Sequence, residues 1–252
     1  ARQRVLLADV LWHLHDVAQH RASAGPSIPG PRLWGLVAGV AGTGKTFIQQ
    51  FVKLFCSMFS CCSTSSVMVA PTGVAADNCG GSTPERALAM DGRSSKVLRG
   101  TKQLPLPTSK QQRVAQLQEQ YQHVLALMCD EVSMYGRCFM GQVAAAASRC
   151  FGGGEVVDDE QPLWGGLGLV LFFGDFCQLQ PVCEPDGVLY DRRPPRTVSG
   201  QHGLAAYQSL TSYYELNEPI RQDATSALYT ELRNARHGVV ISTGSTRSVR
   251  IV

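Results

Sequence analysis

Apolar runs of four to six residues recur along the chain, with polar or helical stretches between them. An unbroken apolar run is typical of a strand buried on both faces, and strands that alternate with helices are typical of a parallel sheet. The pattern therefore predicts an α/β fold, in which helices cover both faces of a mostly parallel sheet. The expected strands are Leu33–Ala38, Val67–Ala70, Val124–Met128, Leu169–Phe173 and Tyr213–Leu216.

Helical periodicity appears on both sides of the first expected strand. Residues Arg4–His20 are predicted to form a helix, which the Pro-, Gly- and Ser-rich loop Ser23–Pro31 joins to that strand. A second helix is expected to begin at Thr46. Its apolar residues share one face and are Phe47, Ile48, Phe51, Val52, Phe55 and Met58.

Polar residues suited to binding or catalysis follow the first four expected strands. In open α/β sheets, ligands bind outside the carboxyl ends of the strands, so these residues are expected to meet around one site. They are Lys45, Thr72, Asp130 with Glu131, and Asp175 with Gln178.

The first of these strands runs into a phosphate-loop pattern, LWGLVAGVAGTGKT. Gly39, Gly42 and Gly44 let the backbone approach a ligand closely, so that successive N–H groups converge on phosphate oxygens. Lys45 then reaches the β- and γ-phosphates, and the Thr46 hydroxyl ligates Mg²⁺. The start of the following helix adds a positive dipole end. The sequence therefore predicts a nucleoside triphosphate site.

Two further polar pairs extend this prediction. Asp130 at a strand end is suited to hold Mg²⁺, and Glu131 to orient or deprotonate the attacking water. Gln178 is suited to contact the γ-phosphate or its water. Taken alone, the acidic pair is equally compatible with an ordinary strand end at the surface, and Gln178 alone fits a polar turn that caps a strand better than a phosphate contact.

Bulk composition is that of a globular protein. The 252 residues are 44% hydrophobic and 17% charged, and the formal net charge of +3 does not by itself indicate nucleic acid. Nine cysteines without a Cys-x-x-Cys pair favour reduced thiols and an intracellular location. The longest apolar run, Leu163–Gly174, is too short for a bilayer span, so no membrane partner is expected.

One stretch, Arg86–Gln122, interrupts the strand and helix pattern and is expected to be a small basic insertion outside the sheet. It is as compatible with a solvated loop as with a surface for a phosphate backbone. Its basic residues are Arg86, Arg93, Lys96, Arg99, Lys102, Lys110 and Arg113, against the acidic Asp91 and Glu119.

Five segments in order carry a specific resemblance: GVAGTGKT, VAPTGVAADNCGGST, CDEVSM, GDFCQLQPV and LNEPIRQD. Together they resemble superfamily-one DNA helicases of the petite-integration-frequency type, with their Helitron and RecD-like relatives, from Gln3 to Gly238. The resemblance implies a RecA-like domain that binds ATP and Mg²⁺ and moves 5′-to-3′ on single-stranded DNA or at a fork. It also implies a nuclear or mitochondrial location, work in DNA repair, recombination and telomere maintenance, and a monomer.

The same resemblance implies roles for individual residues. Gln3 would lie near the adenine base, and Arg221 would place a guanidinium on the γ-phosphate. A salt bridge at a helix start is the alternative for Arg221. The implied nucleotide contacts are Gln3, Gly39, Ala41, Gly42, Thr43, Gly44, Lys45 and Thr46, with Thr46 and Asp130 on the metal. Catalysis would involve Lys45, Asp130, Glu131, Gln178 and Arg221, and DNA contacts would come from Pro71, Thr72, Gly73 and Asn78.

Two departures from the family pattern matter. Where the family usually has Thr-Ile-His, this chain has Thr83-Pro84-Glu85, which is expected to weaken phosphate contact locally. Residues 239–252 do not align, so a motor domain is expected over 1–238, followed by an unaligned tail and without the family's second motor domain. A single motor domain has no partner to close against ATP. This chain alone is therefore expected to bind ATP and single-stranded DNA but not to unwind duplex.

Two alternatives remain open at this stage. The chain would instead be a P-loop ATPase or switch that acts on another protein, or a decayed helicase fragment that keeps the fold without turnover. DNA-stacking aromatics are also undecided, because Phe139, Phe151, Trp164 and Phe176 fit a core equally well.

Overall fold

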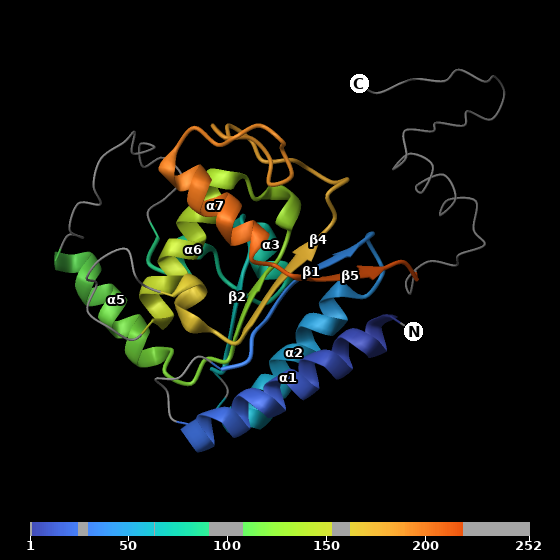
Figure 1. The fold of residues 1–252 in the computed structure, drawn as a ribbon, viewed down its shortest axis with the longest axis vertical. Helices are drawn as coiled ribbons and strands as arrows, with labels where there is room; N and C mark the ends of the chain where they lie inside the picture. Colours follow the sequence, from blue (N-terminus) through green and yellow to red (C-terminus); the bar gives the residue numbers. More distant parts are fainter. Residues whose placement is uncertain (1, 25–29, 63, 91–107, 153–161, 219–252) are drawn as a thin grey trace.

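The protein is organised around a five-stranded sheet in which every strand pair is parallel, with strand order β2-β3-β4-β1-β5 (Figure 1). The computed structural model describes residues 2–24, 30–62, 64–90, 108–152 and 162–218. All five expected strands are present, within a few residues of the predicted positions. They are β1 (Leu33–Gly39), β2 (Ser66–Val69), β3 (Ala126–Cys129), β4 (Leu169–Gly174) and β5 (Ser212–Leu216).

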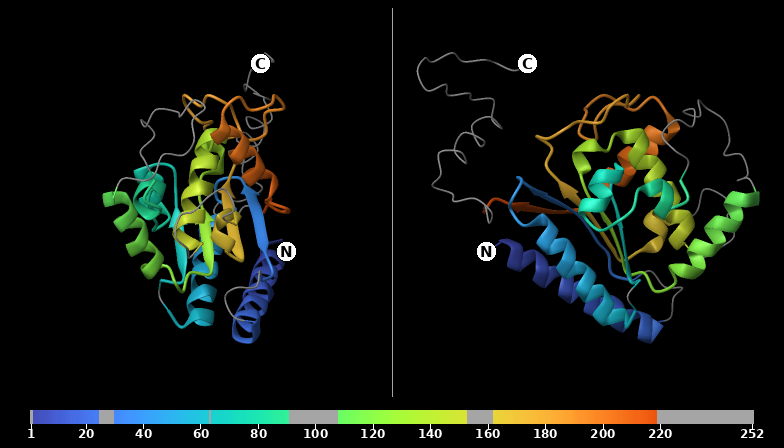
Figure 2. Two further views of the ribbon diagram at one scale, coloured as in Figure 1. Left: turned by 60° about the vertical axis from the view of Figure 1, so that its left-hand side comes forward. Right: turned by 180° about the vertical axis from the view of Figure 1, so that it is seen from behind.

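Helices cover both faces of the sheet, as the alternating pattern predicts (Figures 1 and 2). Helices α1 (Arg2–Ala24) and α2 (Lys45–Ser60) pack on one face, whereas α5 (Thr108–Gln120), α6 (Arg137–Phe151) and α7 (Val198–Gln208) lie on the other. Two short helices, α3 (Gly73–Asn78) and α4 (Pro84–Ala87), follow β2. The 3-10 turn η1 (Val132–Met134) directly follows β3, and the 3-10 turn η2 (Leu163–Gly166) directly precedes β4.

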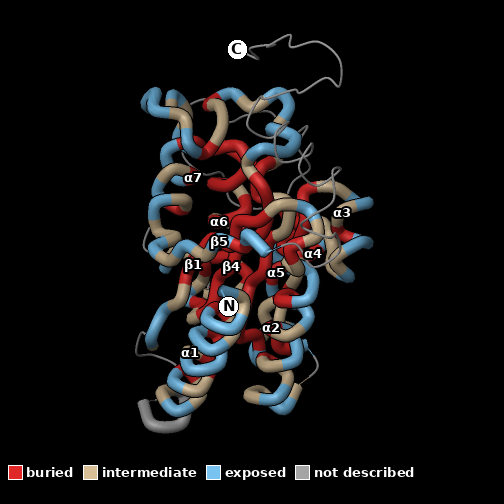
Figure 3. Tube along the Cα trace, turned by 90° about the vertical axis from the view of Figure 1, so that its right-hand side faces the viewer, coloured by how far each residue is buried: buried red, intermediate tan, exposed pale blue. Residues whose placement is uncertain are grey.

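The three central strands, β1, β3 and β4, are buried on both faces, which explains their apolar sequences, whereas the edge strand β5 alternates between exposed residues and buried or partly buried ones. In β3, Ala126 and Met128 belong to the core under α1 and α2, whereas Leu127 and Cys129 belong to the core under α5, α6 and α7. Figure 3 shows this buried centre as a continuous red band between exposed helix surfaces. Each of these three strands thus joins two separate hydrophobic cores.

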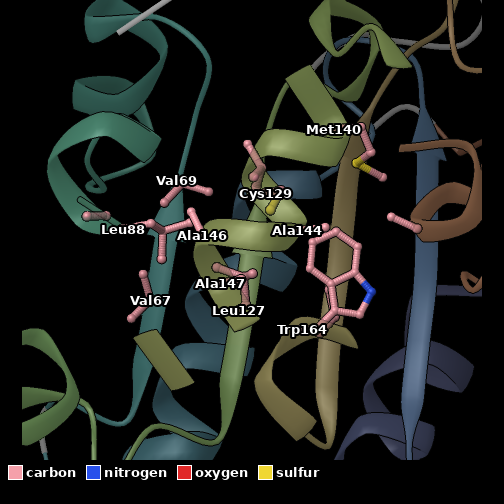
Figure 4. Packing of buried hydrophobic residues seen from close by; sticks show 14 of the residues in the cluster. Val67, Val69, Leu88, Leu127, Cys129, Met140, Ala144, Ala146, Ala147 and Trp164 are labelled. Carbon is pink, nitrogen blue, oxygen red and sulfur yellow. The ribbon is translucent and has the colours of Figure 1, made fainter. Parts of the chain in front are cut away.

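On the α6 side, small side chains let the helix lie close to the sheet (Figure 4). Ala144 and Ala147 face the sheet beside the fully buried ring of Trp164, whose Nε1–H donates to Ser209 Oγ at 3.2 Å. Phe139 is also buried. Trp164 and Phe139 are therefore core residues and have no free ring face on which a DNA base could stack.

Helix α2 begins within one residue of the predicted start, but its buried stripe differs from the expected one. Ile48 and Val52 are buried as expected, together with Gln49 and Cys56. Phe47 and Met58, by contrast, are 48% and 64% exposed. The apolar surface of this helix is wider than the sheet and α1 can cover, so periodicity alone could not identify the buried face.

His13 fixes the middle of α1 to the start of β4. Its Nε2–H donates to the backbone oxygen of Gly168 at 2.8 Å. Burial lowers the pKa of His13 below its ordinary value of 6.5, and the hydrogen bond to Gly168 and the charge of Asp16 only partly oppose this. The folded protein therefore binds this proton less readily than the unfolded chain does.

We expect the stabilising effect of His13 to weaken as the pH falls through 6.5 towards the lower pKa of the folded state. The free energy of unfolding, measured with urea on either side of this pH, should show a smaller loss on acidification in His13→Gln, which keeps an N–H donor. His202→Gln, on the exposed surface of α7, is the control. Equal acid sensitivity of all three proteins would contradict the assignment.

Helices α6 and α7 cross at close range because each contributes a glycine to the contact. A Cβ added to Gly141 would collide with the backbone oxygen of Ser199, and one added to Gly203 would collide with the backbone oxygen of Arg137. The helices therefore pack backbone against backbone and act as one rigid pair.

The long segment from β4 to α7 is fastened to the start of that helix pair. Glu184 Oε1 accepts a hydrogen bond from the backbone N–H of Cys138 at 2.6 Å, in the first turn of α6. The Asp186 carboxylate accepts from the backbone N–H groups of Arg196 at 2.8 Å and Thr197 at 3.0 Å, and Thr197 is the N-cap of α7. Two carboxylates thus hold this segment in place.

Candidate nucleotide-binding site

The turn between β1 and α2 has the backbone shape that phosphate binding requires. Gly42 and Gly44 adopt left-handed conformations with φ of 84° and 87°, which side chains with a Cβ adopt with difficulty. A Cβ on Gly39 would lie 2.6 Å from Thr43 Oγ1, so the loop closes tightly at its base. In the described part of the chain, no side chain caps the start of α2. Its first N–H groups are therefore available to an anion.

Lys45 lies over this loop. Its Nζ donates to the backbone oxygens of Gly39 at 2.7 Å and Val40 at 3.2 Å. Thr46 follows it on the exposed first turn of α2, with its hydroxyl at the same end of the helix. The loop therefore holds an ammonium group and a hydroxyl where the β- and γ-phosphates of a bound nucleotide would lie.

Gln3 is far away in sequence yet contacts the same loop. Its Nε2 donates to the backbone oxygen of Thr43 at 2.6 Å, and the Thr43 hydroxyl donates to Val40 O at 2.8 Å. Helix α1 thus contributes a side chain to the phosphate loop. The predicted role of Gln3 at the adenine base stays a prediction.

The acidic pair lies at the end of β3. Asp130 accepts the backbone N–H of Glu131 on its own Oδ1 at 3.0 Å, and its own N–H donates to Val69 O. Glu131 has a left-handed backbone, with φ of 53°, immediately before η1. A non-glycine residue in this region is costly and is held there by its surroundings.

The electrostatics of Glu131 show that residues from three strand ends meet here. Burial raises the pKa of its carboxyl group, and the charge of Asp130 raises it further. The ammonium of Lys45 opposes this shift, and Asp175 adds to it. Residues after β1, β3 and β4 therefore lie near Glu131, and the sequence predicts that Thr72, after β2, joins them.

A close backbone contact joins the ends of β3 and β4. A Cβ on Gly174 would lie 2.7 Å from the backbone nitrogen of Val132, so only glycine fits beside the acidic pair. Asp175 is 3% exposed and accepts the backbone N–H of Cys177 at 3.0 Å. Its backbone oxygen accepts from the N–H of Gln178 at 2.9 Å, and the side chain of Gln178 is exposed. Asp175 thus shapes the turn that carries Gln178.

These residues fit Mg²⁺ and a triphosphate. Magnesium is commonly held by one or two carboxylates together with substrate phosphates, not by a cage of protein ligands. Among the described residues, no three His, Cys, Asp or Glu side chains form a ready metal site. A site made of Thr46, Asp130 and the nucleotide itself is in keeping with that observation.

The predicted DNA-contacting residues lie at and beyond the end of β2. Pro71 is buried, and the Thr72 hydroxyl caps α3 by accepting the N–H of Ala75 at 3.2 Å. Gly73 and Asn78 are exposed on α3. The residues therefore lie on α3 and in the turn just before it, but their role as DNA contacts stays a prediction.

Sequence reasoning missed one neighbour of the acidic pair. Cys79, at the end of α3, is close enough to Asp130 and Glu131 that their charges, after burial, raise the pKa of its thiol. A lone cysteine in a turn carries no sequence signal of this position. The end of α3 and the acidic pair are thus neighbours.

Several predictions fall partly or wholly outside the described residues. Arg221 and the tail 239–252 lie there, as does much of the basic stretch Arg86–Gln122. Within that stretch, α5 packs Val114 and Leu117 into the core. All nine cysteines are free thiols. None of the described helices is both long and apolar enough to cross a bilayer.

Comparison with known proteins agrees with this geometry. A family model described as PIF1-like helicase matches residues 34–235. No curated protein sequence matches the chain. Among solved structures, Pif1 helicase from Candida albicans is similar with a TM-score of 0.56 and 21% identity, over 91% of this chain and 44% of that chain.

Two Bacteroides structures give the same result. Pif1 bound to single-stranded DNA has a TM-score of 0.52 and 19% identity, over 91% of this chain and 46% of that one. Pif1 in complex with ADP-AlF4 has a TM-score of 0.51 and 20% identity, over the same shares of the two chains. The chain spans less than half the length of these relatives, and at this identity the likeness shows a shared RecA-like α/β fold. Since the family match runs from β1 to beyond β5, the chain belongs to the PIF1-like helicase family.

Proposed function

We propose that this chain is an ATP-hydrolysing motor domain of a DNA helicase, and that single-stranded DNA stimulates its turnover. The arrangement of Lys45, Asp130 and Asp175 around the half-buried Glu131 carries this proposal. A lysine and carboxylates around an uncapped helix start are the groups that phosphoryl transfer from ATP requires. A protein that only binds a phosphate anion has no need of a half-buried carboxylate near its lysine.

Each group has a proposed role in hydrolysis. Lys45 binds the β- and γ-phosphates and offsets their charge, and Gln3 fixes the loop from α1. Thr46 and Asp130 would hold Mg²⁺, which when bound neutralises charge on the phosphate oxygens. Glu131 orients the attacking water and accepts its proton. Its raised pKa makes it a better base than an exposed glutamate.

Two further groups complete the proposed site. Gln178 contacts the γ-phosphate from the turn that Asp175 shapes. Arg221, by its place in the segment LNEPIRQD, supplies a guanidinium to the charge that develops during transfer.

Pro71, Thr72, Gly73 and Asn78 are proposed to contact the DNA backbone through hydroxyl, amide and main-chain groups. The Thr72 hydroxyl accepts a hydrogen bond from Ala75 N and keeps its own proton for a phosphate oxygen. The relatives support a DNA partner, because one was solved with single-stranded DNA and another at forked duplex DNA. Movement in the 5′-to-3′ direction, a monomeric state, a nuclear or mitochondrial location, and work in DNA repair, recombination and telomere maintenance are proposed from the family resemblance.

The test is steady-state ATP hydrolysis by the purified chain with Mg²⁺, with and without oligo-dT. We expect oligo-dT to raise the rate of hydrolysis by on the order of tenfold or more. Phosphoryl transfer depends on how the catalytic groups are positioned, and a bound strand is expected to improve their positions. Turnover indifferent to DNA would instead favour a P-loop switch that acts on a protein. Nucleotide binding without hydrolysis under either condition would favour a decayed helicase.

A further inference from the structure

The segment between β4 and α7 carries an exposed basic loop, Tyr190–Arg196. Figure 1 places it in the orange loops above α7, at the end of the molecule towards which β4 points. The side chains of Arg192, Arg193 and Arg196 are all exposed. Three arginines and one aspartate give the loop a formal charge of +2.

The backbone of this basic loop is fixed from beneath. The buried guanidinium of Arg137 donates to the backbone oxygens of Asp191 and Arg193. At the other end, Asp186 accepts the N–H of Arg196. A loop held by buried groups on its inner side presents its outer side chains with little loss of backbone entropy on binding. The basic loop is therefore a preorganised surface.

Two of the three arginines keep an unbalanced charge. Arg193 Nη2 lies 2.6 Å from Asp191 Oδ2, and these hydrogen bonds hold the pKa of Asp191 well below its usual range. Within the described ranges, no carboxylate lies within salt-bridge distance of Arg192 or Arg196. Arg192 and Arg196 are thus the groups from which an anionic partner would gain most.

An aromatic ring begins the basic loop and links it to the nucleotide site. Tyr190 is 47% exposed, and its ring packs edge-on against Phe176 with centroids 5.4 Å apart. Its hydroxyl accepts a hydrogen bond from Gln180 Nε2 at 3.2 Å. Phe176 and Gln180 flank Gln178 in the turn after β4. Tyr190 therefore links the basic loop directly to the segment proposed to contact the γ-phosphate.

We propose that the basic loop binds the phosphate backbone of single-stranded DNA, with Arg192 and Arg196 on phosphates and Tyr190 offering a ring for a base. Arginines beside an exposed aromatic ring suit a strand that has both charge and bases, whereas an acidic protein surface would use the charge alone. The proposal rests on the proposed function, and adds to it a DNA contact apart from the residues around α3.

The test is direct binding of labelled oligo-dT to the full chain, measured by fluorescence anisotropy without nucleotide over a range of salt. We expect Arg192→Gln with Arg196→Gln to lose on the order of tenfold in affinity at low salt. The slope of log affinity against log salt should fall by about 1.4, or about 0.7 for each phosphate that is no longer neutralised. Replacing both residues by lysine should restore most of the slope.

Lys53→Gln is the matched control, because it removes one exposed positive charge from α2, outside the basic loop. Affinity and slope of the double variant equal to those of this control would overturn the proposal. Poly-L-glutamate bound as tightly as oligo-dT would also overturn it, in favour of an acidic protein.

The same samples separate this inference from the proposed function. A loss of oligo-dT binding in the double variant, in a chain whose hydrolysis ignores DNA, would uphold the basic loop and reject the motor. DNA-stimulated hydrolysis, together with oligo-dT binding that the two substitutions do not change, would uphold the motor and reject the basic loop.

Discussion

Replacement of Lys45 by alanine is expected to lower kcat/KM for ATP by roughly a hundredfold to a thousandfold, the range for losing one donor that stabilises transition-state charge. The reason is the position of Lys45 Nζ, which lies 2.7 Å from Gly39 O in the phosphate loop and whose charge acts on Glu131. Without it, the loop retains only backbone N–H groups for the phosphates. ATP hydrolysis and nucleotide affinity should both be measured.

The control for this variant is Lys53→Ala, on the exposed side of the same helix. It removes an identical charge away from the loop and should keep hydrolysis near the level of the original chain. Thermal unfolding should show both variants folded, since Lys45 Nζ donates to carbonyl groups of the loop and belongs to neither hydrophobic core. Hydrolysis by Lys45→Ala at the unaltered rate would mean that turnover occurs elsewhere or in a contaminant.

Replacement of Glu131 by glutamine should separate binding from chemistry. The amide keeps the size of the side chain and its left-handed backbone, but it cannot accept a proton from water. We expect kcat to fall by roughly a hundredfold to ten-thousandfold, the range for loss of a general base. Nucleotide affinity should hold or rise, because one negative charge is removed beside the triphosphate. Single-turnover hydrolysis and a fluorescent-nucleotide titration measure the two quantities.

Glu119→Gln, an exposed glutamate on α5, is the matched control and should change neither quantity. A fall in affinity as large as the fall in kcat would show that Glu131 contributes to holding nucleotide or metal. Its assignment as the base would then be wrong.

The sequence predicts the central strands well because β1, β3 and β4 are buried on both faces. Ala126 and Leu127 lie on opposite faces of β3, yet both are apolar, since helices cover both sides. Such runs leave few alternatives to a central parallel strand. The gathering of Lys45, Asp130 and Asp175 follows from the same geometry, because parallel strands end at the same edge.

Other features depend on contacts between distant segments and could not be predicted. Nothing in the alternation of strands states that β4 lies between β3 and β1, which is what brings Gly174 against Val132. The buried face of α2 depends on where α1 packs. The basic loop carries no distinctive sequence pattern, because its exposure depends on Arg137, which is far away in the chain and holds the loop backbone.

The fastening of the β4–α7 segment has a mechanical consequence. Glu184 and Asp186 tie it to the first turn of α6 and to the cap of α7, and Gly141 and Gly203 lock those helices together. If the turn at Gln178 shifts when phosphate is lost, the segment between β4 and α7 cannot move separately, because it is held at α6 and α7. The shift is therefore passed on to the helix pair. The α6–α7 flank would then move together with the turn at Gln178.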